Sequence, residues 1–405
     1  MKPTLEILSQ GEELVTGQVL DTNARWLSEQ AVNAGFTVTR HHTVGDKLED
    51  LAGILQDIAQ RADCCICTGG LGPTSDDLTA EAVALAFNMP LAFDAIAYAQ
   101  ISQYFHQRKR PMPEVNRKQA MLPQGAQCLE NNWGTAPGFA LMHGRCWLVF
   151  LPGVPLEMER LFQEHIMPTW PTRFALQKDT LVTLKTLGLG ESSIQERIAD
   201  IALGDGVQLG FRATRDDVQT KLLFPPAYSD AAIAQLVSQF SAQLGDYVFA
   251  VQGLDGTDDD LVGVIDRLMN KQGQTLAVLE TASLGLLAAK CVGVNWLISA
   301  SYEQSIAALG QDRLATPENL IDAAKNLAIA TQKRSGASLV LVQLYAGDHA
   351  QMHDKNQTIA VHSVLWADNA YQQSSHDLGG PIQRKQNQAA LLSLDLLRRH
   401  LQNKA

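Results

Sequence analysis

The sequence predicts a mixed α/β protein with an N-terminal three-layer αβα domain on a largely parallel sheet, a small α+β domain and a C-terminal α/β domain. Over residues 1–170, segments with a two-residue apolar period alternate at short spacing with segments of period 3.6. Two of the strand-to-helix connections there are rich in glycine and proline. Ligands of open α/β sheets bind where parallel strands end, so these connections are the expected site.

The predicted elements of the first domain follow one another in order. Strands are expected at 4–9, 36–41, 63–68 and 145–151, and helices at 22–35, 48–62 and 78–87. The helix at 22–35 has Leu27 and Ala31 on one face, and Gly35 suits a left-handed C-cap. A further helix begins at Pro155, because proline is favoured in the first helical turn.

Two linker-like stretches divide the chain into three predicted domains. The Pro-rich MPTWPTRF closes the first domain, 1–170. Residues 178–252 have the order strand, helix, strand, strand, helix, strand, which is typical of a small α+β domain. The polar GLDGTDDD precedes the third domain, 257–405, where strands are expected at 274–280, 338–346 and 357–367 between helices.

Composition and charge exclude several classes of protein. A hydrophobic fraction of 46% with 19% charged residues is that of an ordinary globular chain. The formal charge of -11 argues against general attraction to nucleic acid or to anionic lipid, so the expected partner is a small molecule. There is neither a signal-peptide pattern nor an apolar run of about 18 residues, and we expect a cytoplasmic protein without a membrane span.

The six cysteines form no disulfide framework for a chain of 405 residues. Three of them lie in the run CCIC, at Cys64, Cys65 and Cys67. A metal site is one interpretation of such a cluster. The run belongs to an expected strand, whose alternate residues face opposite sides of the sheet. We therefore predict small buried thiols rather than metal ligands.

The stretch CTGGLGPTSDDLTAEA, residues 67–82, has the composition of a phosphate-binding loop. Gly69, Gly70 and Gly72 allow the backbone to approach a ligand, because glycine has no side chain and adopts positive φ. Thr74 and Ser75 add hydroxyl donors just before a helix, whose N-terminal amides favour anions. The loop lacks the lysine of a G-x-x-x-x-G-K-[ST] motif.

Asp76 and Asp77 follow directly and would by themselves repel an anionic ligand. A divalent cation between carboxylate and phosphate resolves this conflict, because magnesium and manganese prefer oxygen ligands. The alternative is structural, since aspartate and serine are common helix caps and glycine and proline are common turn residues. One cap needs only one acid, so the adjacent pair favours a functional site.

Six blocks along about 160 residues closely resemble the competence/damage-inducible protein CinA family. They are LSQGEELVTGQVLDTNARWLSEQ, VGDKLEDL, CTGGLGPTSDDLTAEAVALAF, NRKQAMLPQGA, NNWGTAPGF and LPGVPLEMERLF. The resemblance implies an N-terminal molybdopterin-binding domain of the MoaB/MogA-like fold, a KH-like middle domain and a CinA-type C-terminal domain. It also implies a metal-dependent pyrophosphatase that splits ADP-ribose into AMP and ribose 5-phosphate, with Mg, Mn or Co as the metal and potassium as a further ion.

The resemblance also assigns the site residues of the first domain. It places the metal on Asp46, Asp76 and Asp77, which with Lys118 form the catalytic set. A polarised water is the expected nucleophile, and lysine or arginine would offset the charge of the leaving phosphate. Glu12 stands where the family usually has aspartate. The nucleotide-binding residues implied by the motifs are Gly69, Gly70, Gly72, Thr74, Ser75, Glu13, Asp21, Asn23, Asn116, Arg117, Gly153, Pro155 and Glu157.

The third domain departs from its family pattern. The resemblance implies a nicotinamide mononucleotide deamidase with the sequence Ala-Glu-Ser-Cys-Thr-Gly-Gly, whereas this chain has LETASLG. Thr281 stands at the nucleophile position, and in an ungapped alignment Ser305 stands where the lysine base is expected. A threonine nucleophile needs a base nearby, so we predict a deamidase-like fold without that activity.

A further pair, His349 and His353, has helical i, i+4 spacing with Asp348 and Asp354 around it. We interpret it as a solvated loop rather than a metal site, since structural zinc usually has four ligands.

Three functions from different classes remain open. The first is the ADP-ribose pyrophosphatase. The second is a nucleotide- or pterin-binding module without turnover, and the third is a regulatory or scaffold protein in which the degenerate third domain senses a nucleotide or holds a dimer. Closed two-fold dimers are the commonest assembly, so we expect a homodimer.

Overall fold

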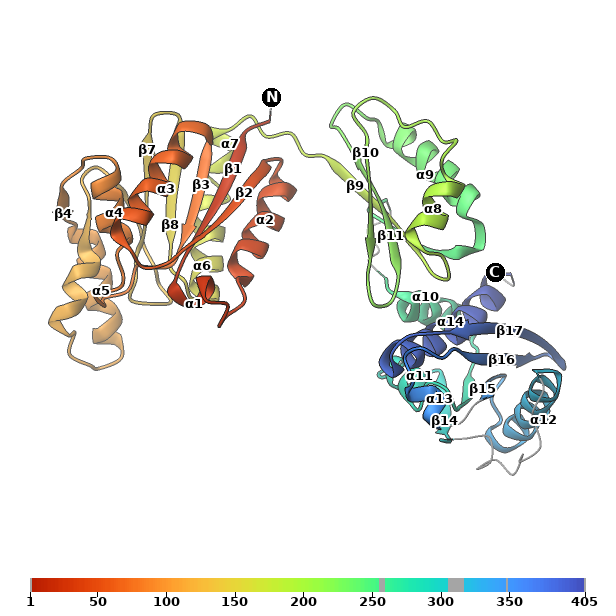
Figure 1. The fold of residues 1–405 in the computed structure, drawn as a ribbon. Coiled ribbons are helices and arrows are strands. Elements are labelled where there is room, and N and C mark those ends of the chain that lie inside the picture. The colour runs from red at the N-terminus through yellow and green to blue at the C-terminus, as the bar shows by residue number, and fades with distance from the viewer. Residues whose placement is uncertain (1, 255–258, 305–316, 347–348, 404–405) are drawn as a thin grey trace. The chain divides into compact units, whose positions relative to one another are not determined.

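The computed structural model describes residues 2–254, 259–304, 317–346 and 349–403 (Figure 1). The chain divides into two compact units, 1–179 and 180–405, which we call unit 1 and unit 2. None of the helices in the described ranges is both long and apolar enough to cross a lipid bilayer.

Unit 1 is built on a six-stranded sheet with the order β2-β1-β3-β8-β7-β6. The first four strands of that order are parallel, whereas β7 and β6 are antiparallel to their neighbours. The mixed α/β class predicted from the sequence is therefore confirmed. The strands are β1 (Thr4–Gln10), β2 (Thr37–Val44), β3 (Cys64–Thr68), β6 (Gln127–Leu129), β7 (Gly138–His143) and β8 (Cys146–Leu151), with β4 (Leu91–Phe93) and β5 (Met121–Pro123) pairing separately.

Helices cover both faces of this sheet and give the three layers seen in Figure 1. Ile7 of β1 packs in a core with residues of α2 and α6, whereas the adjacent Leu8 packs on the opposite face with residues of α3 and α4. The alternation follows from the two-residue period of a strand. The helices are α1 (Glu12–Val15), α2 (Thr22–Ala34), α3 (Leu48–Arg61), α4 (Thr79–Ala86), α5 (Ala95–Gln107), η1 (Glu114–Ala120), α6 (Pro155–Leu161), η2 (Phe162–Ile166) and α7 (Trp170–Arg173).

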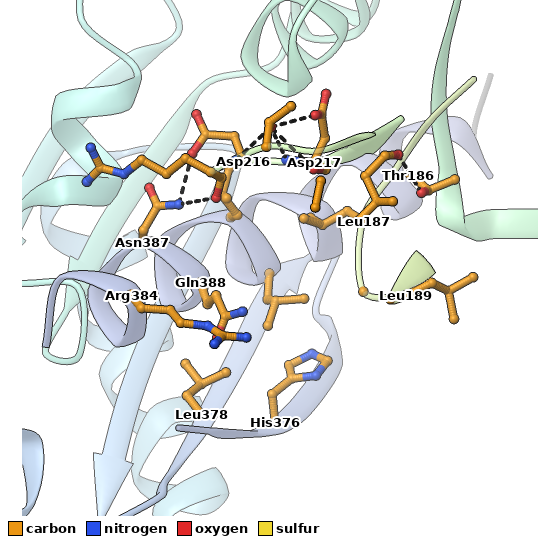
Figure 2. A pocket seen from close by; sticks show the side chains of 18 of the residues that line it. Thr186, Leu187, Leu189, Asp216, Asp217, His376, Leu378, Arg384, Asn387 and Gln388 are labelled. Carbon is orange, nitrogen blue, oxygen red and sulfur yellow. Dashed lines mark hydrogen bonds between the residues drawn. The ribbon is translucent and has the colours of Figure 1, made fainter. Parts of the chain in front are cut away.

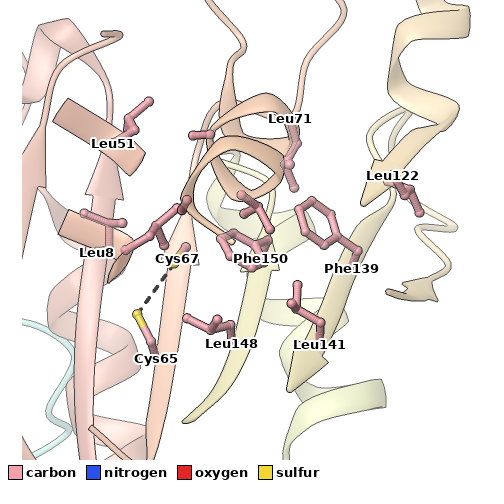
Figure 3. Packing of buried hydrophobic residues seen from close by; sticks show 14 of the residues in the cluster. Leu8, Leu51, Cys65, Cys67, Leu71, Leu122, Phe139, Leu141, Leu148 and Phe150 are labelled. Carbon is pink, nitrogen blue, oxygen red and sulfur yellow. Dashed lines mark hydrogen bonds between the residues drawn. The ribbon is translucent and has the colours of Figure 1, made fainter. Parts of the chain in front are cut away.

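The cysteine run forms β3 at the centre of this sheet. Cys64, Cys65 and Cys67 are buried and reduced, as predicted. Figure 3 shows Cys65 and Cys67 on the same face of β3, with their sulfur atoms 3.6 Å apart among the leucine and phenylalanine side chains of the core. Burial raises the pKa of the Cys64 thiol well above its ordinary value, so it stays protonated at neutral pH.

The first part of unit 2 is a four-stranded antiparallel sheet with the order β10-β11-β9-β12. Helices α8 and α9 pack on it through a core that includes Ile194, Ile233 and Phe240. The elements are β9 (Thr180–Thr186), α8 (Glu191–Arg197), β10 (Gln208–Ala213), β11 (Val218–Phe224), α9 (Asp230–Leu244), η3 (Gly245–Tyr247) and β12 (Val248–Gln252).

The second part of unit 2 is a five-stranded mixed sheet with the order β14-β13-β15-β16-β17. Strand β13 is parallel to β14 and β15, and the two remaining pairs are antiparallel. Sequence patterns missed β14, β17, α11 and α12, and placed the start of the last helix at 389 rather than at Ile382. The solvated loop expected at His349 and His353 was wrong, because these residues begin and end the short helix α13. The elements are α10 (Leu261–Gln272), β13 (Leu276–Glu280), α11 (Leu286–Lys290), β14 (Leu297–Tyr302), α12 (Pro317–Ser335), β15 (Leu339–Ala346), α13 (His349–His353), β16 (Ile359–Ala367), β17 (Ala370–Leu378) and α14 (Ile382–Gln402).

Candidate functional site

The loops that carry the predicted residues meet at the carboxyl edge of the parallel strands in unit 1. Strand β1 pairs with β2 on one side and with β3 on the other, so the chain changes direction across the sheet at β1. Such a reversal opens a crevice at the carboxyl ends of the strands. The loops that begin after Gln10, Val44, Thr68 and Leu151 all leave this edge.

The glycine loop after β3 bends sharply at its first two residues. Gly69 and Gly70 have φ of 99° and 65°, in the region that favours glycine. The Gly69 amide donates to the carbonyl of Leu151 at 3.1 Å, which ties this loop to the end of β8. Within the described residues, no acceptor is found for the backbone N–H groups of Gly70, Leu71 and Gly72. The bend therefore leaves main-chain donors available to an anion.

Gln10, at the end of β1, joins three of these loops and was not singled out from the sequence. Its side chain is buried, and its Nε2 donates to Asp46 Oδ1 at 2.9 Å and to the carbonyl of Asp76 at 3.4 Å. Its Oε1 accepts the hydroxyl of Thr79 at 2.5 Å. Gly70 lies against the same amide and has no room there for a side chain. The sequence signal was a long amide as the last residue of a buried strand, at the edge where the ligand loops begin.

The three acids predicted to hold a metal have different surroundings. Both oxygens of Asp46 accept protein hydrogen bonds, from Gln10 Nε2 at 2.9 Å and from the Glu12 amide at 3.1 Å. Oδ2 of Asp77 accepts the amide and the hydroxyl of Thr74, at 2.8 and 2.6 Å. Asp76 is exposed. Two of the three acids therefore stabilise the loops, and one faces solvent.

The side chain of Asp76 is the open carboxylate of the loop. The Thr74 hydroxyl and the amide of Asp76 itself hold its pKa below the ordinary value. The hydroxyl carries a single proton, and its 2.6 Å contact is with Asp77, so the two acids share one donor. Asp76 is thus ionised throughout the neutral range.

The described residues contain no group of three histidine, cysteine, aspartate or glutamate side chains placed to hold a metal ion together. Asp46, Asp76 and Asp77 therefore do not form a ready three-carboxylate cage. Magnesium commonly binds one or two carboxylates together with substrate phosphates and water. The donor set fits a metal that arrives with a phosphate ligand better than one held by protein alone.

The basic side chains of the Asn-Arg-Lys motif do not converge on the loop as free cations. Lys118 Nζ donates to the carbonyls of Thr74 and Asp77, at 3.0 and 2.5 Å, and lies 3.2 Å from a Glu81 oxygen. The guanidinium of Arg117 is 5.4 Å from the ring centre of Phe93. Lys118 therefore stabilises the loop through its carbonyl groups and is not a free cation.

Other predicted binding residues have structural contacts of their own. Asn116 is buried and donates to Gln119 Oε1 at 2.8 Å. Asp21 caps α2 by accepting the Ala24 amide at 2.9 Å. The carboxylate of Glu13 lies against Gly11, where a side chain would meet it at 2.7 Å.

The turn after β8 lies beside the glycine loop. A side chain at Gly153 would lie 3.4 Å from the Cα of Gly69, and Asn23 Nδ2 donates to the carbonyl of Gly153 at 2.8 Å. The Oδ1 of Asn23 is buried without a partner in the described residues. Pro155 begins α6. These contacts bring the start of α2 and the two predicted turns to one place.

Glu157, in the first turn of α6, accepts a hydrogen bond from Asn131 Nδ2 at 2.6 Å. Burial raises the pKa of Glu157, and the Asn131 contact only partly offsets this. Its carboxylate lies against Gly134, which has no room for a side chain. In this structure Glu157 organises the loop before β7 rather than the glycine loop after β3.

In unit 2, the predicted nucleophile position is closed. Thr281 is fully buried; its hydroxyl donates to the carbonyl of Gln343 and accepts the Tyr345 amide, both at 3.2 Å. Ser305, Asp348 and the side chain of His349 lie outside the described residues. The arrangement therefore leaves Thr281 no exposed hydroxyl.

Comparison with known proteins finds two matching domain families and relatives that cover most of the chain. Residues 6–172 match the probable molybdopterin binding domain, and residues 182–250 match the damage-inducible protein CinA KH domain. The chain is 34% identical over 352 residues to a CinA-like protein of Shewanella piezotolerans, with 84% of this chain and 81% of the relative covered. It is 35% identical over 352 residues to a CinA-like protein of Shewanella woodyi, with the same coverage.

Among solved structures, the protein CinA of unknown function from Thermoplasma acidophilum is 31% identical, covering 40% of this chain and 95% of its own, with a TM-score of 0.38. The molybdopterin biosynthesis enzyme MoaB from Thermus thermophilus is 21% identical, covering 42% of this chain and 92% of its own, with a TM-score of 0.29.

Proposed function

Because this chain belongs to the CinA-like protein family, we propose that unit 1 is a metal-dependent nucleotide pyrophosphatase that hydrolyses ADP-ribose to AMP and ribose 5-phosphate. The observation that carries the proposal is the exposed, ionised Asp76 on a glycine loop whose main-chain N–H groups have no acceptor among the described residues, at the switch point of the sheet. A diphosphate with a bound cation satisfies both features, because the loop amides favour the anion and the Asp76 carboxylate favours the metal.

The residues of the loop have separate parts in this proposal. The N–H groups of Gly70, Leu71 and Gly72 bind phosphate oxygens, and the hydroxyl of Ser75 is exposed beside them. Asp76 holds a magnesium, manganese or cobalt ion. When bound, such a metal polarises phosphoryl oxygens and lowers the pKa of a bound water. Lys118 keeps the loop in shape through its two carbonyl contacts.

A second candidate is a nucleotide- or pterin-binding protein without turnover. It is favoured by the internal hydrogen bonds of Asp46 and Asp77, which leave one open carboxylate. In that case ADP-ribose raises the melting temperature by mass action, but no AMP is released. Measuring both quantities on one sample separates the two functions.

The test compares the full chain with Asp76→Asn on ADP-ribose in the presence of Mg, Mn or Co. We expect metal-dependent AMP release from the wild type and a loss of about 100-fold or more in Asp76→Asn, because removing one electrostatic group from a site commonly costs that much. Asp57→Asn, an exposed acid on α3, is the matched control and should keep full activity. If no AMP is released with any of the three metals, the proposal is contradicted. Repeating the assay with potassium tests whether that ion increases AMP release.

For the third domain we propose a deamidase-like fold without deamidase activity. The support is the complete burial of Thr281 together with its two main-chain contacts. Nicotinamide mononucleotide should yield no ammonia with the full chain. Ammonia release that survives Thr281→Ala contradicts both the proposal and the alignment of this motif.

We also propose that the chain forms a homodimer, which sedimentation of the full chain tests. A monomer over the micromolar range contradicts it.

A further inference from the structure

A large cavity is formed by described residues that all belong to unit 2. It has a volume of about 1060 Å³ and is lined by three segments, 186–192, 213–218 and 376–392. Figure 2 shows residues of the first two segments on one side and the start of α14 on the other. This volume is slightly above the range of roughly 300–1,000 Å³ that is typical of small-molecule sites.

The walls of this cavity are fixed to each other. Leu187 packs in the same core as Leu391 and Leu394 of α14. Asn387 Nδ2 donates to the carbonyl of Arg215 and to Asp216 Oδ1, both at 2.9 Å, as the dashed lines in Figure 2 show. The cavity is therefore part of a continuous packed structure.

Leucine side chains from two of the three segments make part of the cavity lining apolar. Leu187, Leu378 and Leu391 are buried, with at most 9% of their surface exposed. Leu189 and Leu392 are half-buried beside them. These leucines favour contact with the flat face of a heterocycle or with an aliphatic group, because apolar contact removes both surfaces from water.

The start of α14 supplies the features that favour an anion. Its N-cap is Pro381, which offers no side-chain cap, and its first turn has no acidic residue. Within the described residues the amides of Ile382 and Gln383 have no acceptor, and the guanidinium of Arg384 has no carboxylate within ion-pair distance. Amides at a helix start together with arginine are the usual donors to phosphate.

Four acids also line the cavity, and two of them already have partners in the protein. Asp216 lies 3.2 Å from Lys290 Nζ, and Asp217 accepts the Thr214 hydroxyl at 2.7 Å, so both are already engaged. Glu191 and Asp377 are exposed on the rim. The engaged acids do not compete with a ligand for the donors of α14.

Two further polar groups lie farther along the cavity. Gln388 is half-buried one turn beyond Arg384, and Figure 2 shows the two side chains extending together from α14. His376 is half-buried on the same side, and burial lowers its pKa, so the imidazole is neutral and offers one donor and one acceptor. At a rise of about 1.5 Å per residue, Gln388 lies about 9 Å along the helix from Ile382.

From this arrangement we infer that the cavity of unit 2 binds a nucleoside monophosphate. The phosphate binds the first amides of α14 and Arg384, the base packs against leucines of the lining, and Gln388 and His376 contact its polar edge. The inference concerns residues of unit 2 alone and does not depend on the hydrolysis proposed for unit 1.

Binding of AMP to the metal-free full chain tests this, with calorimetry for affinity and hydrogen exchange for location. We expect AMP to protect segments 186–192 and 382–392, and Arg384→Ala to weaken this binding at least about 10-fold, since charge-assisted hydrogen bonds to phosphate are among the stronger ones. Arg334→Ala, an exposed arginine at the end of α12, is the matched control and should not change it.

Adenosine and inorganic phosphate separate the two halves of the site, and both should bind at least about 10-fold more weakly than AMP. Gln388→Leu should weaken the binding of AMP but leave the binding of inorganic phosphate unchanged. This second variant keeps the inference testable if Arg384→Ala does not fold. No protection of 382–392, equal affinity in Arg384→Ala, or phosphate binding as tightly as AMP overturns the inference. Loss of AMP binding in Asp76→Asn with no effect of Arg384→Ala assigns the nucleotide to unit 1 and overturns it too.

Discussion

Two loops occupy the same position in two different sheets of this protein and have opposite environments. The loop after β3 in unit 1 and the loop after β13 in unit 2 each follow a strand that lies between two parallel neighbours. In the first, Thr74, Ser75 and Asp76 are exposed. In the second, Thr281 and Ser283 have at most 1% of their surface exposed.

In the second loop, the polar side chains are hydrogen-bonded to neighbouring protein groups. Ser283 Oγ lies 2.5 Å from Glu280 and 2.8 Å from Gln343 Oε1, and Glu280 also accepts the amides of Leu287 and Ala288 at 3.1 Å. The strand edge that favours ligands in one sheet is therefore filled by side chains in the other. Position in the fold indicates where a site can form, and unengaged polar groups decide whether one does.

Among substitutions that test this contrast between the two loops, Gln10→Leu is expected to have the largest effect on stability and on AMP release. The substitution removes a hydrogen bond to the half-buried carboxylate of Asp46 and one from the Thr79 hydroxyl, which keeps the Gly69 carbonyl as an acceptor at 3.0 Å. A hydrogen bond to a charged group contributes about 1.5–3 kcal/mol and one between neutral groups about 0.5–1.5 kcal/mol. We expect the free energy of unfolding to fall by about 2–3 kcal/mol and AMP release to fall with it. Urea unfolding and AMP assays measure both.

Gln107→Leu, at the exposed end of α5, controls for the added leucine and should change neither quantity. A Gln10→Leu protein with wild-type stability and activity would show that the loops of unit 1 keep their shape without this amide.

A smaller effect is expected for Ser283→Ala, because the closed loop of unit 2 loses one donor. The loss of one buried hydrogen bond costs about 1–2 kcal/mol of unfolding free energy, and AMP release should be unchanged. Ser193→Ala, an exposed serine of α8, is the control. If Ser283→Ala lowered AMP release at unchanged stability, the two loops would not be functionally separate.

The smallest effect is expected in the pH profile of Thr74→Val. The Thr74 hydroxyl lowers the pKa of Asp76, so the wild-type carboxylate stays ionised as the pH falls to below its ordinary pKa of 3.8. Removing the hydroxyl raises that pKa, and the acid limb of AMP release should move to higher pH by less than about one unit. Profiles of kcat measured with Mg between pH 3 and 7 test this, and an acid limb that moves downward contradicts it.

The loops of unit 1 were predictable because local chemistry specifies them. Gly69 and Gly70 adopt positive φ, and glycine alone does so at low cost. Asp21 caps α2, and Pro155 begins α6, as their types favour. The role of Gln10 was not predictable, because its partners lie 36 and 69 residues away in the chain.

The sequence by itself determined the mixed α/β class, the order of most elements, the buried thiols of β3 and the location of a glycine-rich loop before a helix, because each follows from period, turn chemistry or residue type nearby in the chain. Only the tertiary structure decided which polar groups are free. It engaged Asp46, Asp77 and Lys118 in loop contacts, left Asp76 open and buried Thr281. Hydrogen-bond partners and exposure depend on segments that are distant in the chain and meet only when the sheets form.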